Sequence, residues 1–151
     1  MLGYWNKPQQ TEAVLVDGAY WSGDLGYMDE GGYVFLVDRS KDMIVSGGEN
    51  VYSTEVEEVL YQHPAVLEAA AFGVPDEMWG EAVRAVVVLR PEHHNVDPDE
   101  IIGFCRQHIA GYKVPKGIDI QTEPLPKSGP GKVLKRELRQ PFWEGQERSV
   151  N

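Results

Sequence analysis

The stretch GYVFLVDRSKDMIVSGGENVYSTEVE, residues 32–57, decides where one kind of structure ends and another begins. Its first part, 33–38, is rich in strand-forming residues, and an apolar run at 43–45 then leads into a glycine turn at 46–50. Thr54 and Glu57 have the spacing of a helix-capping box, which predicts a helix that stops at Pro64. The character of the chain therefore changes after Asp38.

Residues 1–38 predict only a small antiparallel β unit. They are rich in Gly, Tyr and Trp, and turn clusters at 17–18 and 29–32 bound two strand-like runs, 19–28 and 33–38. This part has little apolar mass of its own. We therefore expect it to belong to a larger body that the chain does not contain.

The residues after 38 predict a sheet covered by helices. Strand-like runs occupy 66–74, 81–89 and 118–121, and 75–77 separates the first two. Asp97 has the position of a helix N-cap, with Pro98 at the first helical position and Gly111 just beyond the end, and a short helix is expected at 133–139. This order indicates an α+β fold: a small sheet sandwiched by helices, preceded by a short antiparallel β segment.

Composition bounds what the chain can be. With 151 residues, 42% of them hydrophobic, it can form one compact core and a small appendage. It has no apolar run of the roughly 18 to 20 residues that a membrane-spanning helix needs and no apolar signal-peptide core, so we expect no integral membrane segment and a cytoplasmic location. The single cysteine, Cys105, lies in an apolar helical stretch and is expected to be a buried structural thiol.

Charge is distributed unevenly along the chain. The net charge of −10 argues against nucleic acid as a partner, because a phosphate backbone requires a basic surface. Residues 112–139 nevertheless carry seven basic and three acidic residues, a net charge of +4. This segment is either an ordinary solvated face or a site for phosphate groups.

Five motifs follow one another in a specific order: GYW (3–5), SGDLG (22–26), the stretch 32–57, VPDEMWGE (74–81) and LPKSGPGK (125–132). Each is a weak signal alone. Together they resemble the closing third of acyl-CoA synthetases in the adenylate-forming superfamily, most nearly the fatty-acid–CoA ligases. The resemblance implies that 39–151 is the mobile C-terminal lid domain and that 1–38 is the last strip of a large, mostly absent N-terminal adenylation domain.

The resemblance also implies a reaction in two halves. A carboxylic acid, expected to be a fatty acid, attacks ATP to give acyl-AMP and pyrophosphate, and the thiol of coenzyme A then displaces AMP. The substrates are therefore the acid, ATP with Mg²⁺, and coenzyme A. The Mg²⁺ site is expected in the missing domain, so no bound metal is expected in this chain, and the chain alone is expected to be inactive.

Residue roles follow from the same resemblance. Lys132 matches the catalytic lysine, which places a positive charge between the two anions that react in the first half. Asp24 and Arg39 match the aspartate and arginine that contact ATP or AMP at the ribose. Lys41 matches the hinge about which the lid swings between the two halves.

The remaining predictions concern coenzyme A. Gly47 and Gly48 match the glycine turn that lines the pantetheine tunnel, where the absence of side chains permits close approach. Trp79, Tyr112 and Lys116 match residues that hold coenzyme A in related aryl-CoA ligases, whereas Val114 stands where those relatives have an arginine.

Two alternatives stay open from the sequence. The chain could be a free-standing lid-like binding or interaction module, or the reaction could load the thiol of a carrier protein instead of coenzyme A. The identity of the acid lies in residues outside this chain.

Overall fold

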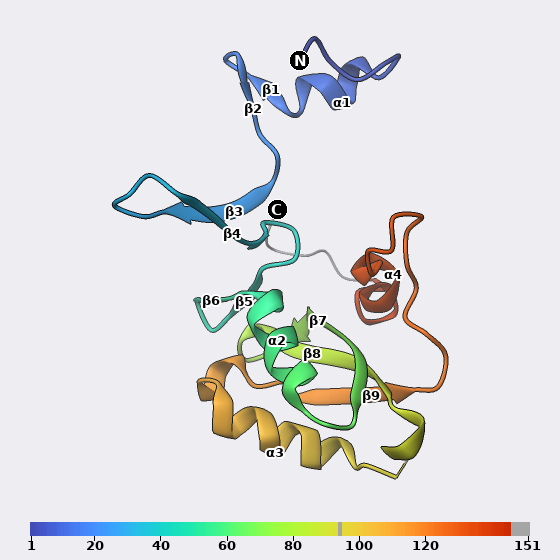
Figure 1. Cartoon of the computed structure of the whole chain (residues 1–151). Coiled ribbons are helices and arrows are strands. Elements are labelled where there is room, and N and C mark those ends of the chain that lie inside the picture. Colours follow the sequence, from blue (N-terminus) through green and yellow to red (C-terminus); the bar gives the residue numbers. More distant parts are fainter. Residues whose placement is uncertain (94, 146–151) are drawn as a thin grey trace. The chain divides into compact units, whose positions relative to one another are not determined.

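A computed structural model describes residues 1–93 and 95–145 of the chain (Figure 1). The chain forms two compact units, an N-terminal unit, Met1–Ser40, and a C-terminal unit, Lys41–Asn151.

The N-terminal unit contains one short helix, α1 (Pro8–Glu12), and two small antiparallel sheets. One sheet pairs β1 (Leu15–Val16) with β2 (Ala19–Tyr20), and the other pairs β3 (Asp24–Met28) with β4 (Val34–Arg39). The single strand expected over 19–28 is therefore wrong, because residues 21–23 leave one sheet before β3 joins the other. All forty residues of this unit are exposed or half-buried, so it lacks a core of its own.

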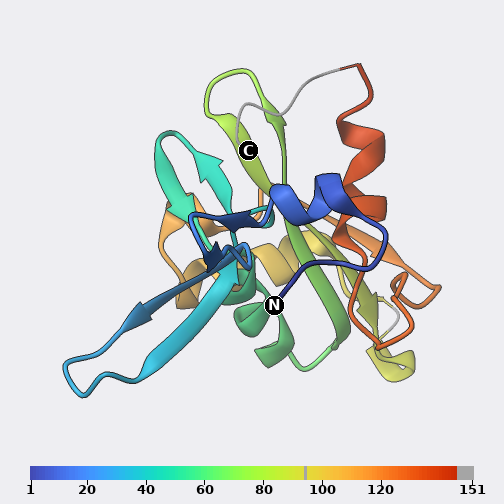
Figure 2. The same ribbon diagram turned by 90° about the horizontal axis from the view of Figure 1, so that it is seen from above.

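The C-terminal unit is built on a five-stranded sheet with the order β6-β5-β8-β7, in which β9 also pairs with β8. The strands are β5 (Ile44–Ser46), β6 (Glu49–Val51), β7 (Val66–Asp76), β8 (Gly80–Leu89) and β9 (Gly117–Gln121). β9 is parallel to β8 and the other pairs are antiparallel. The glycine turn is thus the loop of a β5–β6 hairpin, and Figure 2 shows this hairpin in teal beside the turn that joins β7 to β8.

Helices cover both faces of this sheet, which confirms the expected fold class. α2 (Ser53–Gln62) and α3 (Pro98–His108) pack on one face, whereas α4 (Lys135–Arg139) belongs to the other, and Figure 1 shows α3 below the strands and α4 above them. Alternate residues of β7 serve the two cores: Ala69 and Ala71 lie in the larger, Ala70 and Phe72 in the smaller. β7 is therefore apolar on both faces, as a strand between two helical layers must be.

The predicted N-cap of α3 is confirmed, because the Asp97 side chain accepts a hydrogen bond from the Asp99 amide at 2.8 Å. The capping box at Thr54 is wrong. Tyr52 is the N-cap of α2 and makes no side-chain cap, while Glu57 turns to the Ala71 amide instead, at 2.8 Å. A tertiary partner has replaced the local one.

Two other boundaries differ from expectation. β7 continues through Pro75 to Asp76, so 75–77 is only partly a turn, and α4 begins at Lys135 instead of residue 133. Short 3-10 turns lie at Pro91–His93, Gly111–Lys113 and Gln140–Phe142. Within the described residues, no helix is both long and apolar enough to cross a bilayer.

Cys105 is fully buried on α3, as expected, and burial raises the pKa of its thiol to about 11.

Candidate functional site

Lys132 lies in a tight loop between β9 and α4. Lys127 and Val133 close the loop through an isolated antiparallel β-bridge of their backbones. Inside the loop, the Ser128 amide donates a hydrogen bond to the Lys132 carbonyl at 2.8 Å. Gly131 has a φ of +85°, which favours glycine, and its amide donates to the Ser128 carbonyl at 2.8 Å. Lys132 is exposed, and its ammonium group contacts no charged or polar partner within 1–93 and 95–145. The loop therefore presents an uncompensated positive charge.

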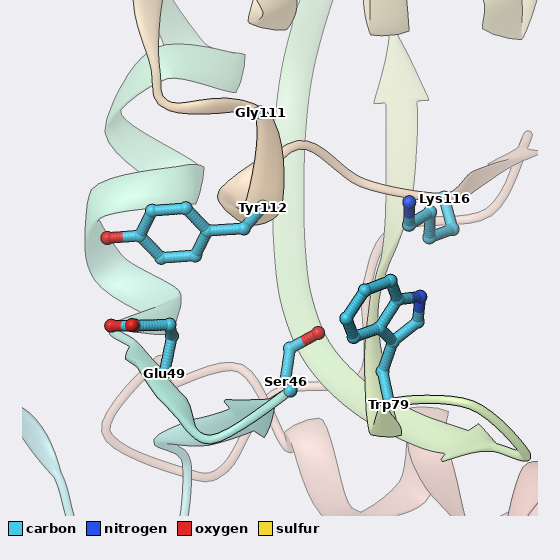
Figure 3. Close-up of a pocket in the computed structure, with 7 residues that line it drawn as sticks. Ser46, Glu49, Trp79, Gly111, Tyr112 and Lys116 are labelled. Atoms are coloured by element: carbon cyan, nitrogen blue, oxygen red, sulfur yellow. The ribbon is translucent and has the colours of Figure 1, made fainter.

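A pocket of about 510 Å³ lies at the β5–β6 hairpin. It is lined by Ser46, Gly47, Glu49, Trp79, Gly111, Tyr112 and Lys116. Figure 3 shows Trp79 and Lys116 on one side, Tyr112 and Glu49 on the other, and Ser46 between them. Four of the five residues predicted to contact coenzyme A therefore come together here from separate parts of the sequence. Gly48 lies in the same turn but does not line the pocket.

The wall formed by Gly47 and Trp79 depends on the absence of a side chain. Gly47 has a φ of +61°, its amide donates to the Trp79 carbonyl at 2.9 Å, and a Cβ built on it would lie 2.6 Å from Trp79 Cε3. Asp76 Oδ1 accepts from the amides of Met78 and Trp79, at 2.9 Å each, and so fixes the turn that carries the indole. Trp79 is 47% exposed, so its packing against Gly47 leaves a large face open to the pocket.

The charge of the pocket is small. Lys116 and Glu49 are its charged lining residues. Neighbouring Lys113 is engaged elsewhere, because Glu55 accepts from its Nζ at 2.7 and 2.8 Å, and this contact raises the pKa of Lys113. Val114 is only 6% exposed and belongs to the larger core, so it adds nothing to the pocket.

Asp24 and Arg39 are brought together within the N-terminal unit. They are partners across β3 and β4, and Arg39 Nε lies 3.5 Å from Asp24 Oδ1. A hollow of about 490 Å³, lined by residues 19–25 and Ser40, lies beside Asp24. The carboxylate of Asp24 and the guanidinium of Arg39 thus lie side by side at one end of a short hairpin, where both are accessible to a ligand.

Lys41 is the first residue of the C-terminal unit. Its carbonyl accepts a hydrogen bond from Arg139 Nη1 at 3.0 Å, and Asp42 Oδ1 lies 3.9 Å from the same nitrogen. The backbone just after the boundary is therefore tied to α4.

Two glutamates hold the Lys132 loop, although the sequence predicted no role for Glu68 and only a local capping role for Glu57. Glu68 on β7 accepts from Lys127 Nζ at 2.6 Å, and Glu57 on α2 accepts from Lys135 Nζ at 2.8 Å. No local pattern predicts these contacts, because the partner lysines lie 59 and 78 positions further along the chain.

Metal binding finds no support in the described part of the chain, where no group of three or more His, Cys, Asp or Glu side chains could hold an ion.

Comparison with known proteins gives consistent matches. A family model described as AMP-binding enzyme C-terminal domain matches residues 55–132. The long-chain-fatty-acid–CoA ligase of Bacillus subtilis is 50% identical over 138 residues, which are 91% of this chain and 24% of the relative. A feruloyl-CoA synthase of an Amycolatopsis species is 49% identical over 142 residues, 94% of this chain and 28% of the relative.

Among solved structures, ATP-bound MatB from Rhodopseudomonas palustris matches with a TM-score of 0.81 at 37% identity, over 93% of this chain and 28% of that chain. The chain thus spans about a quarter of the length of the curated relatives. Because the family model covers more than half of the sequence, the chain belongs to the AMP-binding enzyme C-terminal domain family.

Proposed function

We propose that this chain is the C-terminal part of an AMP-forming acid–thiol ligase, which joins a carboxylic acid to coenzyme A through an acyl-adenylate. The observation that carries the proposal is the exposed, unpaired ammonium of Lys132 at an ordered loop. A compact point charge on a long stem suits a group that must reach a reacting phosphate in another part of a protein.

In the first half-reaction, a carboxylate oxygen attacks the α-phosphorus of ATP and pyrophosphate leaves. Lys132 would stand between the two anions and stabilise the negative charge that they share in the transition state. Asp24 would accept hydrogen bonds from the ribose hydroxyls, and Arg39 would hold the same side of the nucleotide. ATP would carry Mg²⁺, whose ligands we place outside this chain.

In the second half-reaction, a thiol attacks the acyl carbon and AMP leaves. The pocket at Gly47 and Trp79 would admit the pantetheine arm, with the indole as its wall and Lys116 at its charged end. Lys41 would be the hinge that exchanges one half-reaction for the other. The N-terminal strip, 1–38, would belong to the domain that completes the nucleotide site.

The acid is proposed to be a fatty acid, because the Bacillus subtilis relative is a long-chain-fatty-acid–CoA ligase. The feruloyl-CoA synthase relative makes aromatic acids the second class to test. The cytoplasmic location remains a prediction.

A fusion tests this function. In the fusion enzyme, this chain replaces the matching C-terminal segment of the Bacillus subtilis ligase, and ATP–pyrophosphate exchange and acyl-CoA formation are measured with long-chain and aromatic acids. We expect both activities from the fusion enzyme and neither from the 151-residue chain alone. A fusion enzyme that is folded but inactive would contradict the proposal, as would exchange catalysed by the chain alone.

The carrier-protein alternative predicts acyl transfer to a phosphopantetheinylated carrier but not to free coenzyme A. The binding-module alternative predicts a folded fusion enzyme that catalyses no exchange.

A further inference from the structure

The loop that carries Lys132 has two stems, residues 125–127 before it and residues 133–135 after it. A carboxylate contacts each stem. We propose that Glu68 and Glu57 are positioning residues, which anchor the two stems of this loop to β7 and thereby fix where Lys132 is presented for adenylation. The inference rests on the proposed function, in which the Lys132 ammonium must be placed accurately beside the reacting carboxylate and phosphate.

Glu68 holds the first stem. Its Oε2 accepts from the Leu125 amide at 2.9 Å, while its Oε1 accepts from Lys127 Nζ at 2.6 Å. These two contacts lower the pKa of Glu68, and the hydrogen bond from Lys127 contributes most to this shift. One carboxylate on β7 therefore fixes both the backbone and a side chain of the stem, and Leu125 is 2% exposed in the smaller core.

Glu57 holds the second stem. Its Oε1 accepts from Lys135 Nζ at 2.8 Å and from the Ala71 amide at 2.8 Å. The Lys135 ammonium also donates to Ser53 Oγ at 2.6 Å. The side chains of Glu57 and Lys135 are 16% and 14% exposed, so water screens this pair less than an ordinary surface pair. Both anchors thus meet β7 within residues 68–71.

The stems are joined to each other between these anchors. The Leu134 amide donates to the Pro126 carbonyl at 2.8 Å, and Lys127 bridges to Val133. Within this closed loop, Gly131 has a φ of +85°, which permits a fixed turn.

Fixing the loop matters because catalysis depends on accurate placement. A misplacement of about 1 Å can reduce a rate by about 100-fold, even when the altered residue lies away from the reacting atoms. Loss of an anchor should therefore reduce the rate of the step that uses Lys132, while the affinity for substrates that bind elsewhere changes little.

The experiment uses the fusion enzyme and three variants, Glu68→Gln, Lys127→Met and Glu57→Gln. For each, we expect kcat for ATP–pyrophosphate exchange to fall about 10-fold or more, with KM for ATP and acid within about threefold. Thioester formation from supplied acyl-adenylate should keep its rate, because that half does not use Lys132. Glu58→Gln is the matched control: Glu58 is an exposed glutamate on α2 without a polar contact in the described residues, and all rates should stay at the unmodified level.

A second measurement uses the 151-residue chain itself. Hydrogen exchange at the Ser128 and Gly131 amides should become faster in the three variants and remain unchanged in the control, while amides of β8 stay protected. Lys127→Met is the variant least able to disturb folding, because the Lys127 side chain is 40% exposed.

Two results would overturn the proposal. One is unchanged kcat in Lys127→Met and Glu68→Gln with faster loop exchange, since the loop would then be loosened without consequence. The other is equal loss of both half-reactions together with faster exchange in β8, which would mean a folding role. Failure of the proposed function itself is distinct, because the unmodified fusion enzyme would then catalyse no exchange.

Discussion

Replacing Gly47 by alanine should distort the pocket wall by an amount that the structure allows us to estimate. At φ +61° an alanine meets the left-handed backbone penalty of about 1–2 kcal/mol. Its Cβ would also lie 2.6 Å from Trp79 Cε3, well inside van der Waals contact. Overpacking of this kind costs about 1–3 kcal/mol, and the lower end applies because Trp79 is 47% exposed and can shift.

Gly48→Ala is the matched control. Gly48 has a φ of +86° in the same turn, but a Cβ there meets nothing within 4 Å. Gly48→Ala should therefore carry only the backbone penalty of about 1–2 kcal/mol, and Gly47→Ala should lose about 1 kcal/mol more. The free energy of unfolding is measured by urea denaturation of the 151-residue chain, and KM for coenzyme A is measured in the fusion enzyme.

A double-mutant cycle isolates the contact. In a Trp79→Ala background, Gly47→Ala and Gly48→Ala should cost the same. In the fusion enzyme, only Gly47→Ala should raise KM for coenzyme A. Equal losses of stability for the two glycine variants in the unmodified chain would refute the reasoning, because the close approach of Trp79 would then carry no energy.

Three further outcomes are expected. Lys116→Met should raise KM for coenzyme A. The unmodified fusion enzyme should use dephospho-coenzyme A within about fivefold of coenzyme A, because Glu49 lies across the pocket from Lys116 and one ion pair is worth only about 1 kcal/mol. A much stronger preference for coenzyme A in steady-state kinetics would argue against this. The pKa of Glu68 is lowered from its ordinary 4.5, so its contribution to stability should be complete above that pH and should disappear as pH falls through the folded value; urea titrations of the chain and Glu68→Gln should converge at acid pH, and a constant gap would contradict the assignment. Cys105, with its pKa raised to about 11, should react with iodoacetamide at pH 8 only after denaturation, and rapid labelling of the folded chain would exclude a buried thiol.

Local patterns were sufficient for much of the C-terminal unit. Asp97 with Pro98 predicts the start of α3, because the cap depends only on neighbouring residues. The Gly47–Gly48 pair was interpreted as a turn alone, although two residues with positive φ are typical of the loop of a tight hairpin and therefore also predict β6. Pro8, a favourable first helical residue, was a usable signal for α1.

The parts that the sequence could not predict depend on contacts over long separations. Glu57 had the spacing of a local cap, but Ala71 and Lys135 compete for the same carboxylate. Glu68 gives no local signal at all, because its partners Leu125 and Lys127 lie in another motif. The order of the motifs predicts which residues carry the chemistry, whereas only the structure shows which carboxylates contact the Lys132 loop.

The pocket illustrates the same division. Trp79 and Tyr112 were predicted to bind one ligand, and in the structure both line the same pocket as Gly47. Ser46 and Glu49 were not singled out, because their place in the pocket follows from the β5–β6 hairpin.

The role of Lys132 is the central claim, and the separated half-reactions of Lys132→Ala in the fusion enzyme test it most directly. We predict that ATP–pyrophosphate exchange falls by about 100-fold or more, as expected for loss of a charge that stabilises the transition state. Thioester formation from supplied acyl-adenylate should remain close to the unmodified rate. Equal loss of both half-reactions, or retention of both, would contradict the account.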